Sequence, residues 1–229
     1  MSNFNSDGSQ ENDGEDRGEL AWNEFDWERY LREQDGAVQR YLGFYEAARG
    51  DPERIDTVAA KMGWGQGDWS EDADATNPAN DGADDDDFDD DDDDEVYTVH
   101  KNPIFIATKA IFLGLRQSWE ARALDGSQVP QPLAVALLVS LNRGEEHAVQ
   151  AIHALDFGDY AMAVSLFKRS MSALNGSLAL LNSEQAIEHA VVGPWRDGAL
   201  PRMFDLREIW LRVIAECRDE LDRPVDEEN

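Results

Sequence analysis

The sequence predicts an all-α protein, in which a C-terminal antiparallel four-to-five-helix bundle follows a small helical hairpin and a disordered acidic linker. Apolar residues recur at steps of three and four over long stretches on both sides of the linker, which is the spacing of one helix face. Stop and start signals such as Gly158-Asp159 divide these stretches into separate helices. No strand pattern competes with this interpretation.

The linker is defined by its charge. The chain carries a net charge of −29, and residues 70–95 alone contain 15 acids and no base. At their centre, the run from Asp84 to Glu95 is interrupted only by Phe88. Neighbouring carboxylates repel one another and bury almost nothing apolar, so the ordering cost of about 1–2 kcal/mol per residue is not offset. We expect residues 65–95 to form a disordered linker and residues 1–20 a disordered leader.

A helical hairpin is predicted over residues 21–64. The apolar stripe of its first helix is spaced by three or four residues and includes Trp27, Leu31, Val38, Tyr41 and Tyr45. The tripeptide Gly50-Asp51-Pro52 then predicts a left-handed glycine, an N-cap and a first-turn proline, and therefore a new helix. Gly63 predicts the end of that second helix.

The hairpin carries more aromatic surface than two short helices bury between themselves. The sequence leaves three destinations for this surface: a partner protein, the C-terminal bundle, or a small core within the hairpin. We favour a protein partner, held by Trp27, Tyr30, Leu31, Tyr41 and Tyr45. The acidic run would raise the encounter rate with a basic surface of that partner. Its candidate residues are Asp84, Asp85, Asp86, Asp87, Phe88, Asp89 and Asp90.

The bundle is predicted over residues 96–222, before a polar tail at 223–229. Asn102-Pro103 is an N-cap followed by a first-turn proline, and it opens the first helix. The next two helices, near 131–157 and 159–182, are joined by a tight turn and are therefore expected to be antiparallel. A short helix at 184–192 is predicted to end at Gly193-Pro194. A loop containing Trp195 then leads to the last helix, which buries Cys217 as an inert thiol.

One alternative is a helical-bundle enzyme or metal-binding protein that uses Arg143, Glu145, Glu146 and His147. These four side chains fall within five positions and are of types that catalysis and metal binding use. The bundle sequence contains no Glu-x-x-His pair, and the chain has no Cys-x-x-Cys pair and no phosphate-binding glycine loop. We therefore expect no catalytic residue, no metal site and no cofactor.

The charge also restricts the partners. An acidic surface repels phosphate backbones and anionic lipids, so we expect no direct nucleic-acid binding and no membrane binding. The same charge raises a second alternative, in which the acidic run mimics nucleic acid in the binding cleft of another protein. A polar N-terminus and a single cysteine indicate the cytoplasm. The sequence thus predicts a non-enzymatic adaptor that captures a protein partner, and it leaves the oligomeric state open.

Overall fold

Helices form most of the described chain. The computed structural model describes residues 23–65 and 101–223, and within these ranges it contains seven helices and no strand. The all-α prediction is therefore confirmed, while the predicted leader and the acidic run lie outside the described residues. The chain divides into two compact units, and the boundary between them lies within the first helix, between Glu33 and Gln34. The helices are α1 (Glu24–Ala47), α2 (Arg54–Lys61), α3 (Pro103–Ala123), α4 (Gln131–Asp156), α5 (Tyr160–Leu181), α6 (Glu184–Ile187) and α7 (Val192–Asp222).

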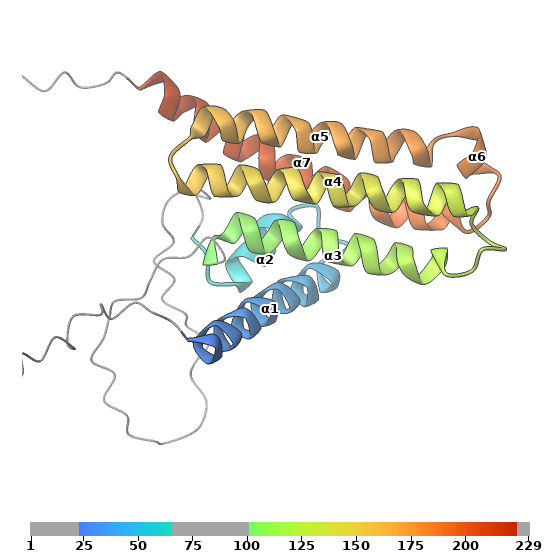
Figure 1. Ribbon diagram of the computed structural model, residues 1–229, viewed down its shortest axis with the longest axis horizontal. Coiled ribbons are helices and arrows are strands. Elements are labelled where there is room, and N and C mark those ends of the chain that lie inside the picture. The colour runs from blue at the N-terminus through green and yellow to red at the C-terminus, as the bar shows by residue number, and fades with distance from the viewer. Residues whose placement is uncertain (1–22, 66–100, 224–229) are drawn as a thin grey trace, which may run out of the picture. The chain divides into compact units, whose positions relative to one another are not determined.

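Four long helices build the predicted bundle. The chain runs back and forth through α3, α4, α5 and α7, so that each of these helices is antiparallel to the one before it (Figure 1). The turn between α4 and α5 contains Gly158 at a φ of 71°, a left-handed conformation that glycine adopts without steric cost. The predicted antiparallel pair is therefore confirmed. Within the described residues, no helix has the length and apolar character needed to cross a bilayer.

Two of the predicted N-caps fix where bundle helices begin. The Asn102 side chain accepts a hydrogen bond of 2.8 Å from the Ile104 amide at the start of α3. The Asp159 carboxylate accepts one of 3.0 Å from the Met162 amide at the start of α5. Each bond satisfies an amide that has no partner within its own helix, so each cap stabilises its helix by about 1 kcal/mol.

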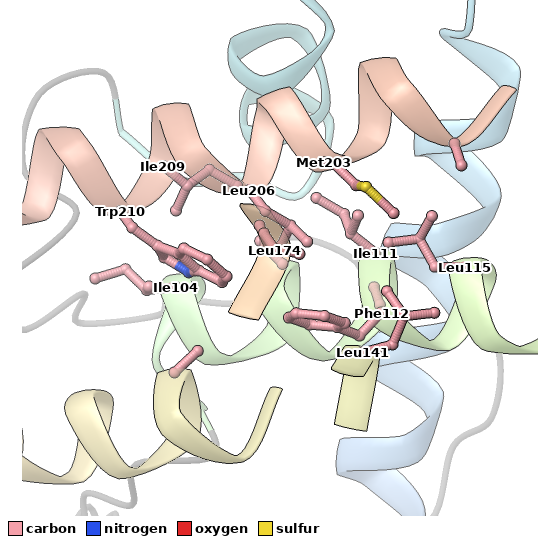
Figure 2. Close-up of a cluster of buried hydrophobic side chains, with 14 of the residues drawn as sticks. Ile104, Ile111, Phe112, Leu115, Leu141, Leu174, Met203, Leu206, Ile209 and Trp210 are labelled. Atoms are coloured by element: carbon pink, nitrogen blue, oxygen red, sulfur yellow. The ribbon is translucent and has the colours of Figure 1, made fainter. Parts of the chain in front are cut away.

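The bundle core contains the indole ring of Trp210. Side chains from α3, α4, α5 and α7 form this core, and all are fully or almost fully buried (Figure 2). The Trp210 ring lies 6.0 Å from the Phe112 ring and 6.1 Å from the Phe167 ring. Its Nε1 donates a 3.2 Å hydrogen bond to Thr108 Oγ1, which satisfies the one polar atom of the indole. Three helices are thus tied together through one side chain.

Helices α4 and α5 approach closely because small residues line their contact. Gly144 contributes a carbonyl that accepts a 2.6 Å hydrogen bond from Ser170 Oγ, and Ser177 Oγ lies 2.9 Å from Ser140 Oγ. Gly144 lies inside α4, which runs as one helix from Gln131 to Asp156. The role of this glycine is to make room for the Phe112 ring against the backbone.

We expect Gly144→Ala to lower the free energy of unfolding by about 1 kcal/mol, because the added methyl group overpacks the core. An ideal Cβ at this position lies 3.3 Å from Phe112 Cζ and 3.7 Å from Ala173 Cβ. The matched variant Gly43→Ala places its Cβ in open space on α1. It should raise stability by up to about 1 kcal/mol, since alanine is the better helix former. Urea unfolding measures both variants, and equal stabilisation would contradict close packing at Gly144.

The start of the last helix differs from the prediction. The short helix α6 ends at Ile187, and α7 already begins at Val192, so the expected loop around Trp195 is helical. Pro194 lies in the first turn of α7, where its missing amide hydrogen would have had no partner. The Trp195 ring is buried against the Trp119 ring at 4.8 Å, and its Nε1 donates a 3.0 Å hydrogen bond to Ser118 Oγ. Burial of this side chain outweighs the local signals for a loop.

The turn before α2 also differs in detail. The predicted left-handed glycine is not Gly50: within the described ranges, the positive φ values belong to Gly63, at 82°, and Gly158. Helix α2 begins at Arg54, two residues after the expected first turn. Asp51 nevertheless organises the turn, because its carboxylate accepts hydrogen bonds from the Glu53 amide and from Thr57 Oγ1 at 2.9 and 2.7 Å. Gly63 follows α2, as predicted.

Candidate functional site

The five candidate partner residues of the hairpin fall into an exposed and a buried set. Trp27 and Leu31 are exposed, at 48% and 44% of their full surface. Tyr30, Tyr41 and Tyr45 are buried, at 7%, 0% and 2%. The candidate residues of the acidic run, Asp84 to Asp90, lie outside the described part of the chain. Two of the five hairpin residues, Trp27 and Leu31, are therefore accessible to a partner in this structure.

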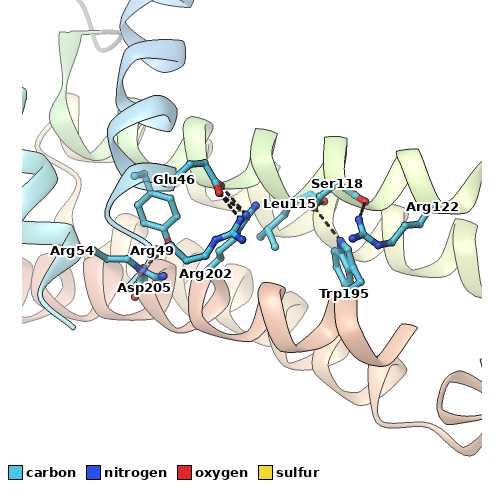
Figure 3. A network of polar contacts seen from close by, with 10 residues as sticks. Glu46, Arg49, Arg54, Leu115, Ser118, Arg122, Trp195, Arg202 and Asp205 are labelled. Atoms are coloured by element: carbon cyan, nitrogen blue, oxygen red, sulfur yellow. Dashed lines mark hydrogen bonds and ion pairs between the residues drawn. The ribbon is translucent and has the colours of Figure 1, made fainter. Parts of the chain in front are cut away.

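Tyr45 is buried because it joins a polar cluster with α2 and α7. Its hydroxyl donates a 2.5 Å hydrogen bond to Asp205 Oδ2, and Arg54 forms an ion pair with the same oxygen (Figure 3). The Arg54 guanidinium also lies over the Tyr45 ring, 4.8 Å from its centroid. Arg54 is itself only 7% exposed. One carboxylate on α7 thus holds residues from both helices of the hairpin.

Two further ion pairs join the hairpin to α7. Arg202 contacts both carboxylate oxygens of Glu46, at 2.7 and 2.9 Å (Figure 3). Arg212 contacts both oxygens of Asp56, at 2.5 and 3.2 Å. The Arg212 contact uses two guanidinium nitrogens and therefore fixes the orientation of the groups as well as their distance, whereas Arg202 contacts Glu46 through Nη2 alone. We name the residues of these contacts the hairpin interface: Tyr45, Glu46, Arg54, Asp56, Arg202, Asp205 and Arg212. Of the three destinations that the sequence left open, the bundle is the one that residues 34–62 use.

The phenol groups in this region are held in their neutral form. Burial raises the pKa of Tyr41 and Tyr45 well above the usual value, and the nearby charge of Asp205 raises both further. The Tyr41 ring stacks between the rings of Trp64 and Tyr45, with centroid distances of 5.6 and 6.1 Å. These rings supply packing within the fold, so a partner would reach them only after the hairpin had separated from α7.

The N-terminal unit keeps an apolar stripe on the surface of α1. Trp27 and Leu31 are four residues apart, which places them on one helix face. The Trp27 ring meets the Tyr30 ring edge to face, with centroids 6.0 Å apart and planes at 84°. Asn23 caps this end of the helix by accepting hydrogen bonds from the amides of Phe25 and Asp26 at 2.8 and 3.2 Å. We call Trp27 and Leu31 the α1 stripe.

The four residues of the alternative enzyme or metal site point in different directions. Glu145 is buried and forms ion pairs with Lys109, at 2.7 Å, and with Arg116 on α3. Burial lowers the pKa of Lys109 and of Arg116, which is expected of cations removed from water. Glu146 is exposed and accepts a weak 3.5 Å hydrogen bond from Gln150. Among the residues that the structure describes, no group of three or more potential ligands is placed to hold a metal ion.

Arg143 and His147 instead line a groove between α4 and α5, which was not predicted from the sequence. We call it the α4–α5 groove, and its volume is about 320 Å³. Its lining residues are Ser140, Arg143, His147, Arg169, Ser172, Ala173 and Gly176. The signal in the sequence is the spacing of three, four and seven between Ser140, Arg143 and His147, which places them on one face of α4. The facing Arg169 belongs to another helix and is brought there only by the fold.

Cys217 is buried in the core, as predicted, and is 2% exposed. Burial raises the pKa of its thiol to about 11, and the neighbouring charge of Glu216 adds to this shift. A thiol in this state is largely protonated at neutral pH and is a poor nucleophile.

Comparison with known proteins adds no further assignment: no protein-family model, no curated protein and no solved structure matches the chain.

Proposed function

We propose that this protein is a non-enzymatic interaction protein that binds a protein partner through the α1 stripe. The supporting observation is that Trp27 and Leu31 remain exposed on one helix face, while the hairpin tyrosines Tyr30, Tyr41 and Tyr45 are buried. An amphipathic helix that keeps large apolar side chains in water commonly places them in a groove of another protein. Tryptophan is among the residues that contribute most to such contacts.

The charge around the stripe is acidic on balance, which favours a basic partner surface. Glu24, Asp26 and Glu28 lie in the first turns of α1 beside Trp27. Arg29 and Arg32 offset part of this charge through ion pairs with Asp26 and Glu28. The acidic run adds a long-range attraction in the same direction, since concentrated like charge speeds the encounter with an oppositely charged surface. In this proposal the stripe supplies most of the affinity, and the acidic run mainly raises the association rate.

The test is affinity capture from an extract of the source cells with the full chain as bait. The double variant Trp27→Ala/Leu31→Ala is expected to lose a specific protein that the wild type retains. Once that protein is identified, deletion of residues 84–95 should slow association and flatten its dependence on salt concentration, with a smaller effect on dissociation. Competition by added DNA or RNA would indicate that the acidic run mimics nucleic acid.

The matched control is Leu124→Ala/Phe204→Ala, which also removes one leucine and one aromatic side chain. Both residues are exposed, at 86% and 56%, and both lie outside the α1 stripe. This control should retain the same partner as the wild type. If the Trp27→Ala/Leu31→Ala variant captured its partner as well as the control does, binding through the stripe would be excluded.

A further inference from the structure

The α4–α5 groove collects basic side chains on a strongly acidic chain. The chain has 49 acids against 20 lysines and arginines, so a chance grouping of residues on its surface would be expected to include acids. The lining of the groove includes two arginines, one histidine and two serines, and no Asp or Glu. The groove is therefore a local reversal of the overall charge.

Neither arginine of the groove is neutralised within the part of the chain that the structure describes. The arginines at the hairpin interface each pair with a carboxylate, whereas Arg143 and Arg169 take part in no ion pair among the described residues. Glu146, three residues after Arg143, is hydrogen bonded to Gln150 and does not line the groove. Two guanidinium groups thus remain available on opposite walls.

One ring nitrogen of a lining residue also lacks a partner. His147 lines the groove, and its Nδ1 is inaccessible to solvent and makes no hydrogen bond within the described structure. More than about 90% of buried polar groups in proteins are hydrogen bonded, so this nitrogen is an exception among the described residues. The base of the groove is firmly held, because Ser140 Oγ donates a 2.9 Å hydrogen bond to the Ala173 carbonyl. Gly176 has no side chain, and a Cβ there would lie 3.5 Å from Ser140 Oγ.

We propose that the α4–α5 groove binds a phosphate group, either as free phosphate or as a small phosphomonoester. Guanidinium groups match the oxygens of phosphate in pairs, and donors on two walls can engage more than the two oxygens of a carboxylate. The imidazole of His147 and the hydroxyl of Ser172 offer further polar contacts. A volume of about 320 Å³ lies at the lower end of the range for small-molecule sites and leaves room for the group that bears the phosphate.

The experiment measures binding of inorganic phosphate and of phenyl phosphate to the full chain by calorimetry. Sodium chloride keeps the ionic strength constant, because salt alone screens the repulsion within a chain of net charge −29. The variant Arg143→Gln/Arg169→Gln is expected to weaken binding by about tenfold or more, since it removes two charge-assisted contacts. The control Arg40→Gln/Arg218→Gln changes the net charge equally at exposed positions outside the groove. It should bind as the wild type does.

Each outcome decides the proposal. Tighter binding of phenyl phosphate than of phosphate identifies a phosphomonoester, and equal binding identifies the free anion. Equal losses in the groove variant and in the control would mean that the anion responds only to overall charge, and this would overturn the proposal. Absence of binding by both probes would overturn it as well. Circular dichroism of each variant confirms that the fold is intact, which is expected because both groove arginines are exposed.

Discussion

Replacing Trp210 by Ala is expected to lower the free energy of unfolding by about 3–5 kcal/mol. The side chain is fully buried, and its ring lies about equally far from the Phe112 and Phe167 rings, at 6.0 and 6.1 Å. Its removal leaves a cavity where α3, α5 and α7 meet, and it leaves Thr108 without the indole as a hydrogen-bond donor. A loss of this size is a large part of the stability of an ordinary domain. Urea unfolding followed by circular dichroism measures it.

Two further variants show whether the loss comes from packing at this site. Trp210→Phe keeps an aromatic ring but removes the donor to Thr108, and we expect it to cost about 1–2 kcal/mol. Trp27→Ala removes the same side chain from an exposed position of α1, and we expect it to cost less than about 1 kcal/mol. Similar losses for Trp210→Ala and Trp27→Ala would contradict the central role of Trp210.

Most helices of the bundle could be predicted because their signals are local. The Asn102 and Asp159 caps and the glycine turn at Gly158 each act within a few residues, and apolar spacing identifies the buried face. The start of α7 could not be predicted in this way. Gly193, Pro194 and Pro201 all weaken a local helix signal, and the helix forms there because residues such as Trp195 are buried by distant elements. Tertiary packing therefore decided this boundary.

For a similar reason, the sequence could not predict which surface covers the aromatic side chains of the hairpin. The sequence indicates that Tyr41 and Tyr45 lie on an apolar face, but not which surface covers that face. The covering contacts join residues that are 151 to 160 positions apart, such as Arg54 with Asp205 and Tyr45 with Asp205. The helical spacing of apolar residues relates neighbours within a few turns and cannot identify pairs at that separation. The same limit applies to the α4–α5 groove, where Arg169 meets residues of another helix.

The hairpin interface depends most on Asp205, and we expect Asp205→Asn to lower the free energy of unfolding by about 3 kcal/mol. The asparagine retains an oxygen that can accept from Tyr45, but it leaves the buried Arg54 cation without a counter-charge. The loss of a single neutral hydrogen bond, as in Tyr45→Phe, should cost only about 1 kcal/mol. The ion pair of the exposed Asp197 with the half-buried Arg196 provides the control. Asp197→Asn should change stability by less than about 0.5 kcal/mol.

The Asp205→Asn variant also tests whether the exposed or the buried aromatic residues of the hairpin bind the partner. Weakening the interface at Asp205 favours states in which residues 34–62 leave α7, and these states expose Tyr41 and Tyr45 to water and to proteases. Cleavage near Gly50 should therefore be faster in Asp205→Asn than in Asp197→Asn. Partner capture should be unchanged, because the α1 stripe is already exposed in the docked hairpin. Stronger capture by Asp205→Asn would instead assign partner binding to the tyrosines that the docked hairpin conceals, and would make undocking part of recognition.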